Sequence, residues 1–252
     1  ELNGTAYALD SSTIDLALSL FPWAPFERSR GALKLHTQMD LRGNIPVLVH
    51  IDHGRSYDTD ILDVLVPEPG AIYVMDRGFL DLVRLYRLTQ AAAFFVVRTK
   101  RGLSLKRTLS RPVDRASGII CDQDVRLGFD RSARKYPERL RKIRYRDPES
   151  GKSLQFLTNN FMLSPLTIAD LYRRRWQIEL FFKWIKQNLR IKSFFGTSKN
   201  AVLTQIWVAM SYYLLLTYIK YQTKYQHSLL TLSRIIREML FERKNLIDIL
   251  SL

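Results

Sequence analysis

Residues 171–189 read LYRRRWQIELFFKWIKQNL and contain neither Pro nor Gly, so they predict one uninterrupted helix. At about 100° per residue, four polar side chains fall within an arc of roughly 60°. These are Tyr172, Arg175, Glu179 and Lys186, and Lys183 lies just beside them. Another side of the helix can pack on a core and consists of Ile178, Phe181, Phe182 and Ile185. The helix thus combines a buried stripe with one carboxylate among several cations.

The polar stripe has two interpretations. A solvated face would be stabilised by pairs at positions i and i+4, and Arg175–Glu179 and Glu179–Lys183 both have that spacing. A single acid among five Lys or Arg residues between 173 and 186 is, however, a poor arrangement for neutralising charge. The excess of cations suits a polyanion that lies over the carboxylate.

Composition narrows the class of protein. The chain has 252 residues, of which 46% are hydrophobic, enough for one large core or one core with an insertion. Its net charge of +15 indicates an anionic partner, most often nucleic acid, with a membrane surface as the rival. One cysteine, Cys121, excludes an intrachain disulfide and suits a reducing cytoplasm, and no secretory signal is visible at Glu1.

One segment is apolar enough to raise the question of a membrane span. Residues 201–219 carry no charge and are flanked by Lys199 and Lys220. They are almost long enough to cross a bilayer. Seven Thr, Gln, Ser or Tyr residues make the segment too polar for a confident span, so we favour a buried core helix from about residue 199 to Tyr221.

Two predicted strands end in an aspartate. Residues 5–10 read as a short strand that ends at Asp10, followed by the turn or cap residues 11–13. Residues 71–76 read as a buried strand that ends at Asp76. A helix to about Leu88 and a strand over 92–97 follow, so we expect a βαβ unit with a parallel pair. Acids at strand ends often only cap turns, but in open α/β sheets this edge also carries sites.

A hairpin is predicted between these two strands. Residues 33–40 and 45–51 are its strands, and residues 41–44 are its turn. Four side chains that follow could hold a metal: Asp52, His53, Asp58 and Asp60. We favour loop chemistry instead, with Asp58 or Thr59 capping a helix over 61–66.

Residues 100–154 differ from the rest. They hold 16 Lys or Arg against 7 Asp or Glu, a net charge of +9 in 55 residues. Residues 142–146 and 153–158 read as a hairpin around the turn 147–151. We expect a β-rich insertion that contacts DNA phosphates, with Phe129, Tyr136 or Tyr145 available to stack on a base. A solvated basic loop with its own small core is the alternative.

The chain therefore divides into three predicted segments: the first part of a catalytic core over 1–99, the basic insertion over 100–158, and the second part of the core over 159–252. Ser164 and Pro165 mark the start of the long helix. After the apolar helix, residues 229–240 and 245–250 predict two short helices.

Three acids form a candidate set. If the long helix packs beside the two strands, Asp10, Asp76 and Glu179 converge, and such carboxylates cannot all stay ionised together without cations. Oxygen ligands of this kind select Mg²⁺ or Mn²⁺. Two such ions can activate a water or a 3′-hydroxyl and stabilise the leaving oxygen of a phosphodiester. With one Cys and four His, the chain shows no obvious thiol or triad catalyst.

The spacing of these residues matches a known pattern. Tyr172-x2-Arg175-x3-Glu179-x6-Lys186 resembles the Y-R-E-K signature of bacterial DDE transposases of the insertion-sequence-four family. Residues 9–13, LDSST, and 74–79, VMDRGF, resemble the two aspartate motifs of that family. The resemblance covers most of the chain, from residue 5 to about 221. It implies an α/β fold, a ribonuclease-H-like mixed sheet flanked by helices, with a β-rich insertion between Asp76 and Glu179.

The resemblance also implies function. Asp10, Asp76 and Glu179 would be catalytic and bind two Mg²⁺ or Mn²⁺ ions, and the enzyme would cut and join double-stranded DNA at insertion-sequence ends in cut-and-paste transposition. The residues expected to contact DNA are Tyr172, Arg175, Lys183, Lys186 and Arg77. A homodimer on two ends, in the bacterial cytoplasm at the nucleoid, is expected. The chain has no Trp between Asp76 and Tyr172 for base stacking, and we expect that the end-recognition domain of the family is missing before the first strand.

Two alternatives stay open. A structure-selective metal-dependent nuclease on the same fold would cut without joining. A truncated, non-catalytic remnant would bind DNA while the three acids stay idle.

Overall fold

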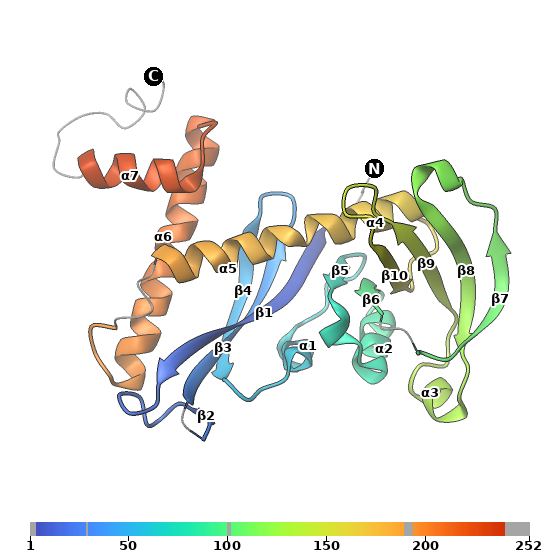
Figure 1. Ribbon diagram of the computed structural model, residues 1–252, viewed down its shortest axis with the longest axis horizontal. Coiled ribbons are helices and arrows are strands. Elements are labelled where there is room, and N and C mark those ends of the chain that lie inside the picture. Colours follow the sequence, from blue (N-terminus) through green and yellow to red (C-terminus); the bar gives the residue numbers. More distant parts are fainter. Residues whose placement is uncertain (1–3, 29, 100–101, 189–193, 240–252) are drawn as a thin grey trace.

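The computed structural model describes residues 4–28, 30–99, 102–188 and 194–239 (Figure 1). Within these residues, ten strands form one mixed sheet. Its first part contains β1 (Ala6–Ala17), β2 (Pro25–Glu27), β3 (Arg30–Asp40), β4 (Ile45–His53), β5 (Ile72–Met75) and β6 (Phe94–Arg98). The strands β3 and β1 pair antiparallel, and β1, β5 and β6 pair parallel, while β4 and the short β2 pair with β3.

The strand β1 is longer than the sequence predicted. Its antiparallel ladder with β3 runs from Tyr7–Asp40 to Ala17–Arg30, so the predicted turn at residues 11–13 is wrong. The parallel ladder with β5 spans only Ala6 to Leu9, which is opposite Met75. Asp10 is therefore the first residue of β1 beyond the parallel pairing, although it does not end the strand. Nonlocal pairing with β3, rather than the local Ser-Ser-Thr pattern, decides the strand length.

The predicted βαβ unit is confirmed. After β5, a short 3-10 turn, η2 (Arg77–Phe79), leads into α2 (Leu82–Gln90), whose N-cap Asp81 accepts hydrogen bonds from two backbone N–H groups. The strand β6 then returns parallel to β5. The predicted hairpin of β3 and β4 is also confirmed. The helix expected after Asp58 is short, because η1 (Asp58–Asp60) is followed only by α1 (Ile61–Val64).

The basic segment continues the sheet. Its elements are β7 (Leu105–Arg111), η3 (Arg115–Ser117), β8 (Ile119–Leu127), α3 (Asp130–Lys135), β9 (Leu140–Arg146) and β10 (Ser153–Thr158). The predicted hairpin of β9 and β10 is present, and β10 pairs antiparallel with β6. Figure 1 shows β7 to β10 at one end of the molecule, in green and yellow. The boundaries of the three predicted segments stay a prediction.

The expectation that Tyr136 can stack on a base is wrong. Its side chain is 1% exposed. Its ring packs against Tyr86 and Phe95, and its hydroxyl lies 2.7 Å from the hydroxyl of Thr89. The aromatic residue thus fills the core between α2 and the insertion. Phe129, in contrast, is exposed and stays available.

The long helix begins as predicted, with Ser164 as N-cap and Pro165 at its first turn. It is not uninterrupted: α4 (Pro165–Arg174) and α5 (Trp176–Asn188) meet at Arg175, whose φ of −52° and ψ of −27° keep the chain close to helical. Figure 1 shows α4 and α5 following one another across a face of the sheet.

The C-terminal helices lie beyond this face. The helix α6 (Lys199–Thr223), capped by Ser198, packs on α5 and β4, and α7 (Leu229–Met239) follows. The predicted helix over 245–250 lies outside the described residues. By length and composition α6 could cross a membrane, with 33% of its most apolar window buried, and one such helix is weak evidence for a span.

Both faces of the sheet are covered. Alternation along the strands sends Ala8 and Val74 into a cluster with Ile178 and Phe181 of α5. It sends Leu9, Tyr73, Met75 and Phe95 into a second cluster with α1 and α2. Asp10 and Asp76 share the parity of Ala8 and Val74, so both point toward the face that α4 and α5 cover.

Candidate active site

Two of the three predicted acids, Asp10 and Glu179, meet at one guanidinium. Arg175, at the junction of α4 and α5, places Nη1 2.5 Å from Oδ2 of Asp10 and Nη2 2.7 Å from Oε1 of Glu179. Arg175 is 7% exposed. The helix spacing accounts for the bond to Glu179 one turn later, whereas the bond to Asp10 joins residues 165 positions apart.

The third acid, Asp76, is held by a side chain of α4. The hydroxyl of Tyr172 donates a hydrogen bond to Oδ1 of Asp76 at 2.9 Å. The ring of Tyr172 packs against Phe156 of β10, and the guanidinium of Arg175 lies over it at 5.4 Å from the centroid. Arg98, at the end of β6, places Nη1 3.6 Å from the same oxygen of Asp76. The folded chain thus brings Asp10, Asp76 and Glu179 to one place, together with three donors.

Arg98 was missed by the sequence interpretation. The signal was a cation directly after the predicted strand 92–97, beside a strand that ends in an acid. Because β5 and β6 are parallel neighbours, their ends meet at one edge of the sheet.

The environment shifts the pKa values of Asp10 and Asp76 in opposite directions. Burial raises the pKa of Asp10, and the repulsion of Glu179 adds to it, while Arg175 and the N–H of Ser11 offset only part of this rise. Burial also acts to raise the pKa of Asp76, but hydrogen bonds from the Arg77 N–H and Tyr172, with the charges of Arg175 and Arg98, lower it overall. Differently tuned carboxylates in one cleft are typical of catalytic sites.

The donor set fits a hard divalent cation. Carboxylates from β1, the end of β5 and α5 are the ligands that Mg²⁺ and Mn²⁺ prefer. Within the described part of the chain, no three Asp, Glu, His or Cys side chains are close enough to hold an ion in this arrangement. Arg175 lies between Asp10 and Glu179 and supplies the positive charge there. Ions would have to displace that guanidinium from at least one carboxylate.

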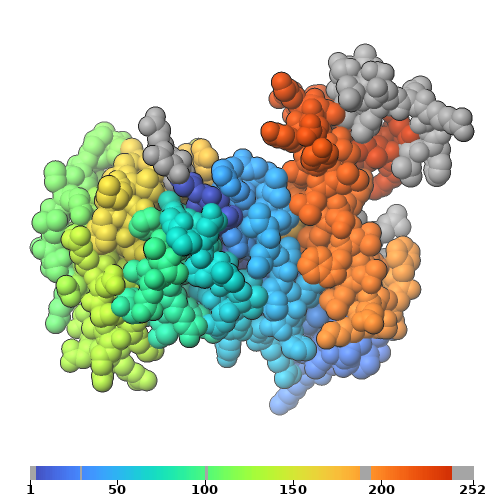
Figure 2. Space-filling model, turned by 180° about the vertical axis from the view of Figure 1, so that it is seen from behind, coloured from blue at the N-terminus to red at the C-terminus, as the bar shows by residue number. Residues whose placement is uncertain are grey.

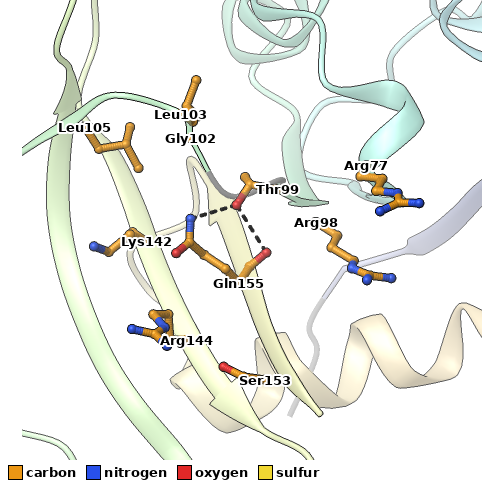
Figure 3. Close-up of a pocket in the computed structure, with 10 residues that line it drawn as sticks. All are labelled: Arg77, Arg98, Thr99, Gly102, Leu103, Leu105, Lys142, Arg144, Ser153 and Gln155. Atoms are coloured by element: carbon orange, nitrogen blue, oxygen red, sulfur yellow. Dashed lines mark hydrogen bonds between the residues drawn. The ribbon is translucent and has the colours of Figure 1, made fainter.

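A basic cavity of about 790 Å³ adjoins Asp76 (Figure 3). Its cations are Arg77, Arg98, Lys142 and Arg144. In Figure 3, Gln155 and Thr99 lie between the Arg77–Arg98 pair and the Lys142–Arg144 pair. Gln155 Nε2 donates a hydrogen bond of 2.8 Å to Thr99 Oγ1. No acid belongs to the described lining, so the cavity suits an anion. The sequence signals for it were the cation density of residues 100–154 and the DNA contact predicted for Arg77.

Comparison with known proteins places this geometry in a family. A family model described as a transposase DDE domain matches residues 3–215. The chain belongs to the DDE transposase family. It is 33% identical over 220 residues to the probable transposase for insertion sequence element IS5377 of Geobacillus stearothermophilus, and this match covers 86% of the chain. It is also 33% identical over 242 residues, 94% of the chain, to the Sinorhizobium fredii protein y4zB, named as a transposase.

This DDE transposase chain spans 57% of the length of the first of these relatives and 67% of the second. A solved structure of piggyBac transposase, in a synaptic complex with hairpin DNA, has a TM-score of 0.52 and 14% identity. That match covers 96% of this chain and 55% of the other. The shared fold confirms the predicted ribonuclease-H-like mixed sheet flanked by helices.

The residues predicted to contact DNA divide into two groups in this DDE transposase. Tyr172 and Arg175 are buried and direct their polar atoms to the acids. Lys183, Lys186 and Arg77 are exposed. Within the described residues none of these three pairs with a carboxylate, so the Glu179–Lys183 pair of the solvated-face interpretation is not formed. The three exposed cations are therefore available to a polyanion, whereas Tyr172 and Arg175 hold the carboxylates.

Proposed function

We propose that the chain is the catalytic part of a DNA transposase that cleaves and joins DNA at insertion-sequence ends, using Asp10, Asp76 and Glu179 as ligands of two divalent cations. The observation that carries this proposal is the convergence of three acids, from segments far apart in sequence, around Arg175 and Tyr172. Membership of the DDE transposase family supports it.

Arg175, Tyr172 and Arg98 would hold the three carboxylates in place for this chemistry. Two Mg²⁺ or Mn²⁺ ions, when bound, supply activation of a water or a 3′-hydroxyl and stabilisation of the leaving oxygen. Before they bind, Arg175 offsets the repulsion between Asp10 and Glu179, which keeps both carboxylates facing the site. Tyr172 fixes the orientation of Asp76, and Arg98 adds positive charge on the side of the basic cavity.

DNA would lie over the exposed cations on either side of the acids. Lys183 and Lys186 on α5 and Arg77 beside Asp76 can contact phosphates, and Lys142 and Arg144 extend this surface into the insertion. Such contacts give affinity without sequence specificity. In the Y-R-E-K pattern of this chain, Lys186 would then contact DNA, while Tyr172 and Arg175 would position carboxylates. The enzyme would act as a homodimer on two ends, in the bacterial cytoplasm at the nucleoid.

The decisive variant is Glu179→Gln in the purified full-length protein. The amide cannot replace a charged metal ligand, so Mg²⁺-dependent cleavage of a cognate DNA end should fall to background, as measured on a labelled duplex. Glu238→Gln changes an exposed glutamate of α7 and should cleave like the wild type. Cleavage at the wild-type rate by Glu179→Gln would rule out the assignment. A pre-nicked end with a free 3′-hydroxyl, joined to target DNA only by a transposase, separates this function from that of a nuclease.

The position of Arg175 favours one second candidate. Its guanidinium already neutralises Asp10 and Glu179, which is also what a DNA-binding chain without a metal site would need. Calorimetric titration with Mn²⁺ distinguishes the two functions. Saturable binding that Asp10→Asn abolishes supports the transposase, whereas an absence of binding by the wild type supports the DNA-binding chain.

A further inference from the structure

A second polar cluster lies on the opposite face of the sheet, directly behind Asp10. Its centre is Asp58 in η1. Oδ1 of Asp58 accepts a hydrogen bond of 2.6 Å from the hydroxyl of Ser11 and lies 2.7 Å from Nζ of Lys34. Lys34 also donates to the carbonyl oxygen of Ser56 at 2.7 Å. We refer to Ser11, Lys34 and Asp58 as the Asp58 cluster.

The Asp58 cluster is connected to the first catalytic acid through Ser11. The hydroxyl of Ser11 points to Asp58, while its backbone N–H donates to Oδ1 of Asp10 at 2.9 Å. Successive residues of a strand point to opposite faces, so one bond on each face fixes the backbone between them. Asp58 therefore restrains the N–H group that orients the carboxylate of Asp10.

The same aspartate lies against the segment that follows the second acid. A Cβ added to Gly78 would be 2.9 Å from Oδ2 of Asp58, so the η2 backbone lies close to that carboxylate. Gly78 is two residues after Asp76, whose carboxylate accepts a hydrogen bond from the N–H of Arg77. Asp58 is thus in contact with the segments that carry both Asp10 and Asp76.

Charge balance is consistent with a fixed, ionised Asp58. Burial acts to raise the pKa of Asp58, but the bonds from Lys34 and Ser11 outweigh it and lower the pKa overall. An ionised carboxylate makes stronger hydrogen bonds than a neutral group does. The cluster is therefore a charge-assisted connection between β1, β3 and η1.

We propose that Asp58 is a positioning residue that sets the relative placement of Asp10 and Asp76 from behind the sheet. This inference rests on the proposed function, because it assigns to Asp58 the support of two metal-binding carboxylates. Residues that support metal ligands typically contribute roughly ten- to a hundred-fold to metal affinity or activity. Asp58 lies on the face opposite the acids and would contact neither DNA nor metal.

The first part of the test needs no metal. In Asp58→Ala, hydrogen exchange measured by mass spectrometry should show lost protection in peptides that contain Ser11 and Arg77–Gly78. Asp63→Asn is a matched control, because Asp63 is also ion-paired, to Arg84 and Arg87, on the adjacent helix α1. It should keep wild-type exchange in both peptides. Unchanged exchange in Asp58→Ala would overturn the inference.

The second part of the test measures metal binding and cleavage. Asp58→Ala should weaken Mn²⁺ binding roughly ten- to a hundred-fold by calorimetry and raise the Mg²⁺ requirement for cleavage. Its Kd for DNA without metal should stay at the wild-type value, and Asp58→Asn, which keeps an acceptor oxygen, should recover part of the loss. If Asp58→Ala does not fold, Ser11→Ala removes only the hydroxyl and should show the same changes in smaller size.

The outcomes separate the two proposals. A wild-type protein that binds Mn²⁺, with an Asp58→Ala variant of equal affinity, overturns the positioning role and leaves the proposed function intact. A wild-type protein with no saturable Mn²⁺ binding overturns the proposed function, and the role of Asp58 falls with it.

Discussion

His36 lies within β3 with its imidazole 0% exposed, and among the described residues neither ring nitrogen has a hydrogen-bond partner. Its ring centroid is 6.1 Å from that of His50 on the adjacent strand. Burial, with smaller contributions from the charges of Lys34 and His50, lowers the pKa of His36 to about 4. At neutral pH the fold therefore contains an uncharged histidine on the same strand as Lys34 of the Asp58 cluster.

This burial makes stability sensitive to acid. The folded chain binds a proton at His36 more weakly than the unfolded chain does, so the stabilisation is fully present above about pH 6.5 and is lost as the pH falls toward 4. The lowered pKa of His36 corresponds to about 3 kcal/mol of unfolding free energy between pH 6.5 and 4. His36→Leu should lose this part of the acid sensitivity when urea unfolding is measured from pH 7 to 4, whereas His53→Leu, at an exposed position of β4, should keep it.

At the scale of elements, Arg141 of β9 connects the basic insertion to the start of α4. Its side chain is 3% exposed and pairs with Asp122 of β8 at 2.7 Å. Its Nη1 donates to the carbonyl oxygens of Leu163 and Asn160, in the loop before α4. The same side chain thus ties two strands of the insertion to the start of the helix pair that carries Tyr172, Arg175 and Glu179.

Removal of Arg141 should therefore be costly. Among the described residues, Arg141→Met leaves buried Asp122 with only the 3.3 Å contact to Arg111, and the expected loss of unfolding free energy is about 3 to 5 kcal/mol. Urea denaturation monitored by circular dichroism measures it. Arg30→Ala removes an exposed pair with Asp15 and should cost less than about 1 kcal/mol. Equal effects of the two variants would contradict the anchoring role.

At the scale of the whole molecule, the cation-rich cavity and the apolar surface of α6 lie in different places. Figure 2 shows the basic insertion, in green, and the helices α6 and α7, in orange to red, at opposite ends. The cavity beside Asp76 gathers four cations where the insertion meets the core. Exposed apolar side chains gather on α6, including Trp207, Val208, Leu215 and Tyr221, while Leu109 and Phe129 are exposed on the insertion. DNA is therefore expected at the insertion end of the sheet.

The salt dependence of DNA binding checks this placement. If Lys142 and Arg144 each contact a phosphate, replacing both by Ala should weaken binding and reduce the slope of log K against log salt by about 2. Fluorescence anisotropy with a labelled duplex at several salt concentrations measures the slope. Replacing Arg234 and Arg237, exposed on α7, by Ala removes the same charge and should leave the slope unchanged. If the α7 double variant changed the salt slope more than the Lys142 and Arg144 double variant does, the DNA would lie elsewhere.

The sequence by itself determined the features that depend on neighbouring residues. Alternation and turn residues predicted the hairpins β3–β4 and β9–β10 and the parallel pair β5–β6. Capping residues predicted the start of α4, and the uncharged apolar run predicted α6. Helical spacing predicted the Arg175–Glu179 pair, and the motifs named the three acids that the fold brings together.

Only the tertiary structure decided the features that depend on contacts between distant segments. Pairing with β3 carries β1 past Asp10, and packing against α2 buries Tyr136. The bonds of Arg175 to Asp10, Tyr172 to Asp76 and Ser11 to Asp58 join residues 165, 96 and 47 positions apart. Local periodicity sets which residues share a face of one element, but the register and packing of whole elements decide what that face meets.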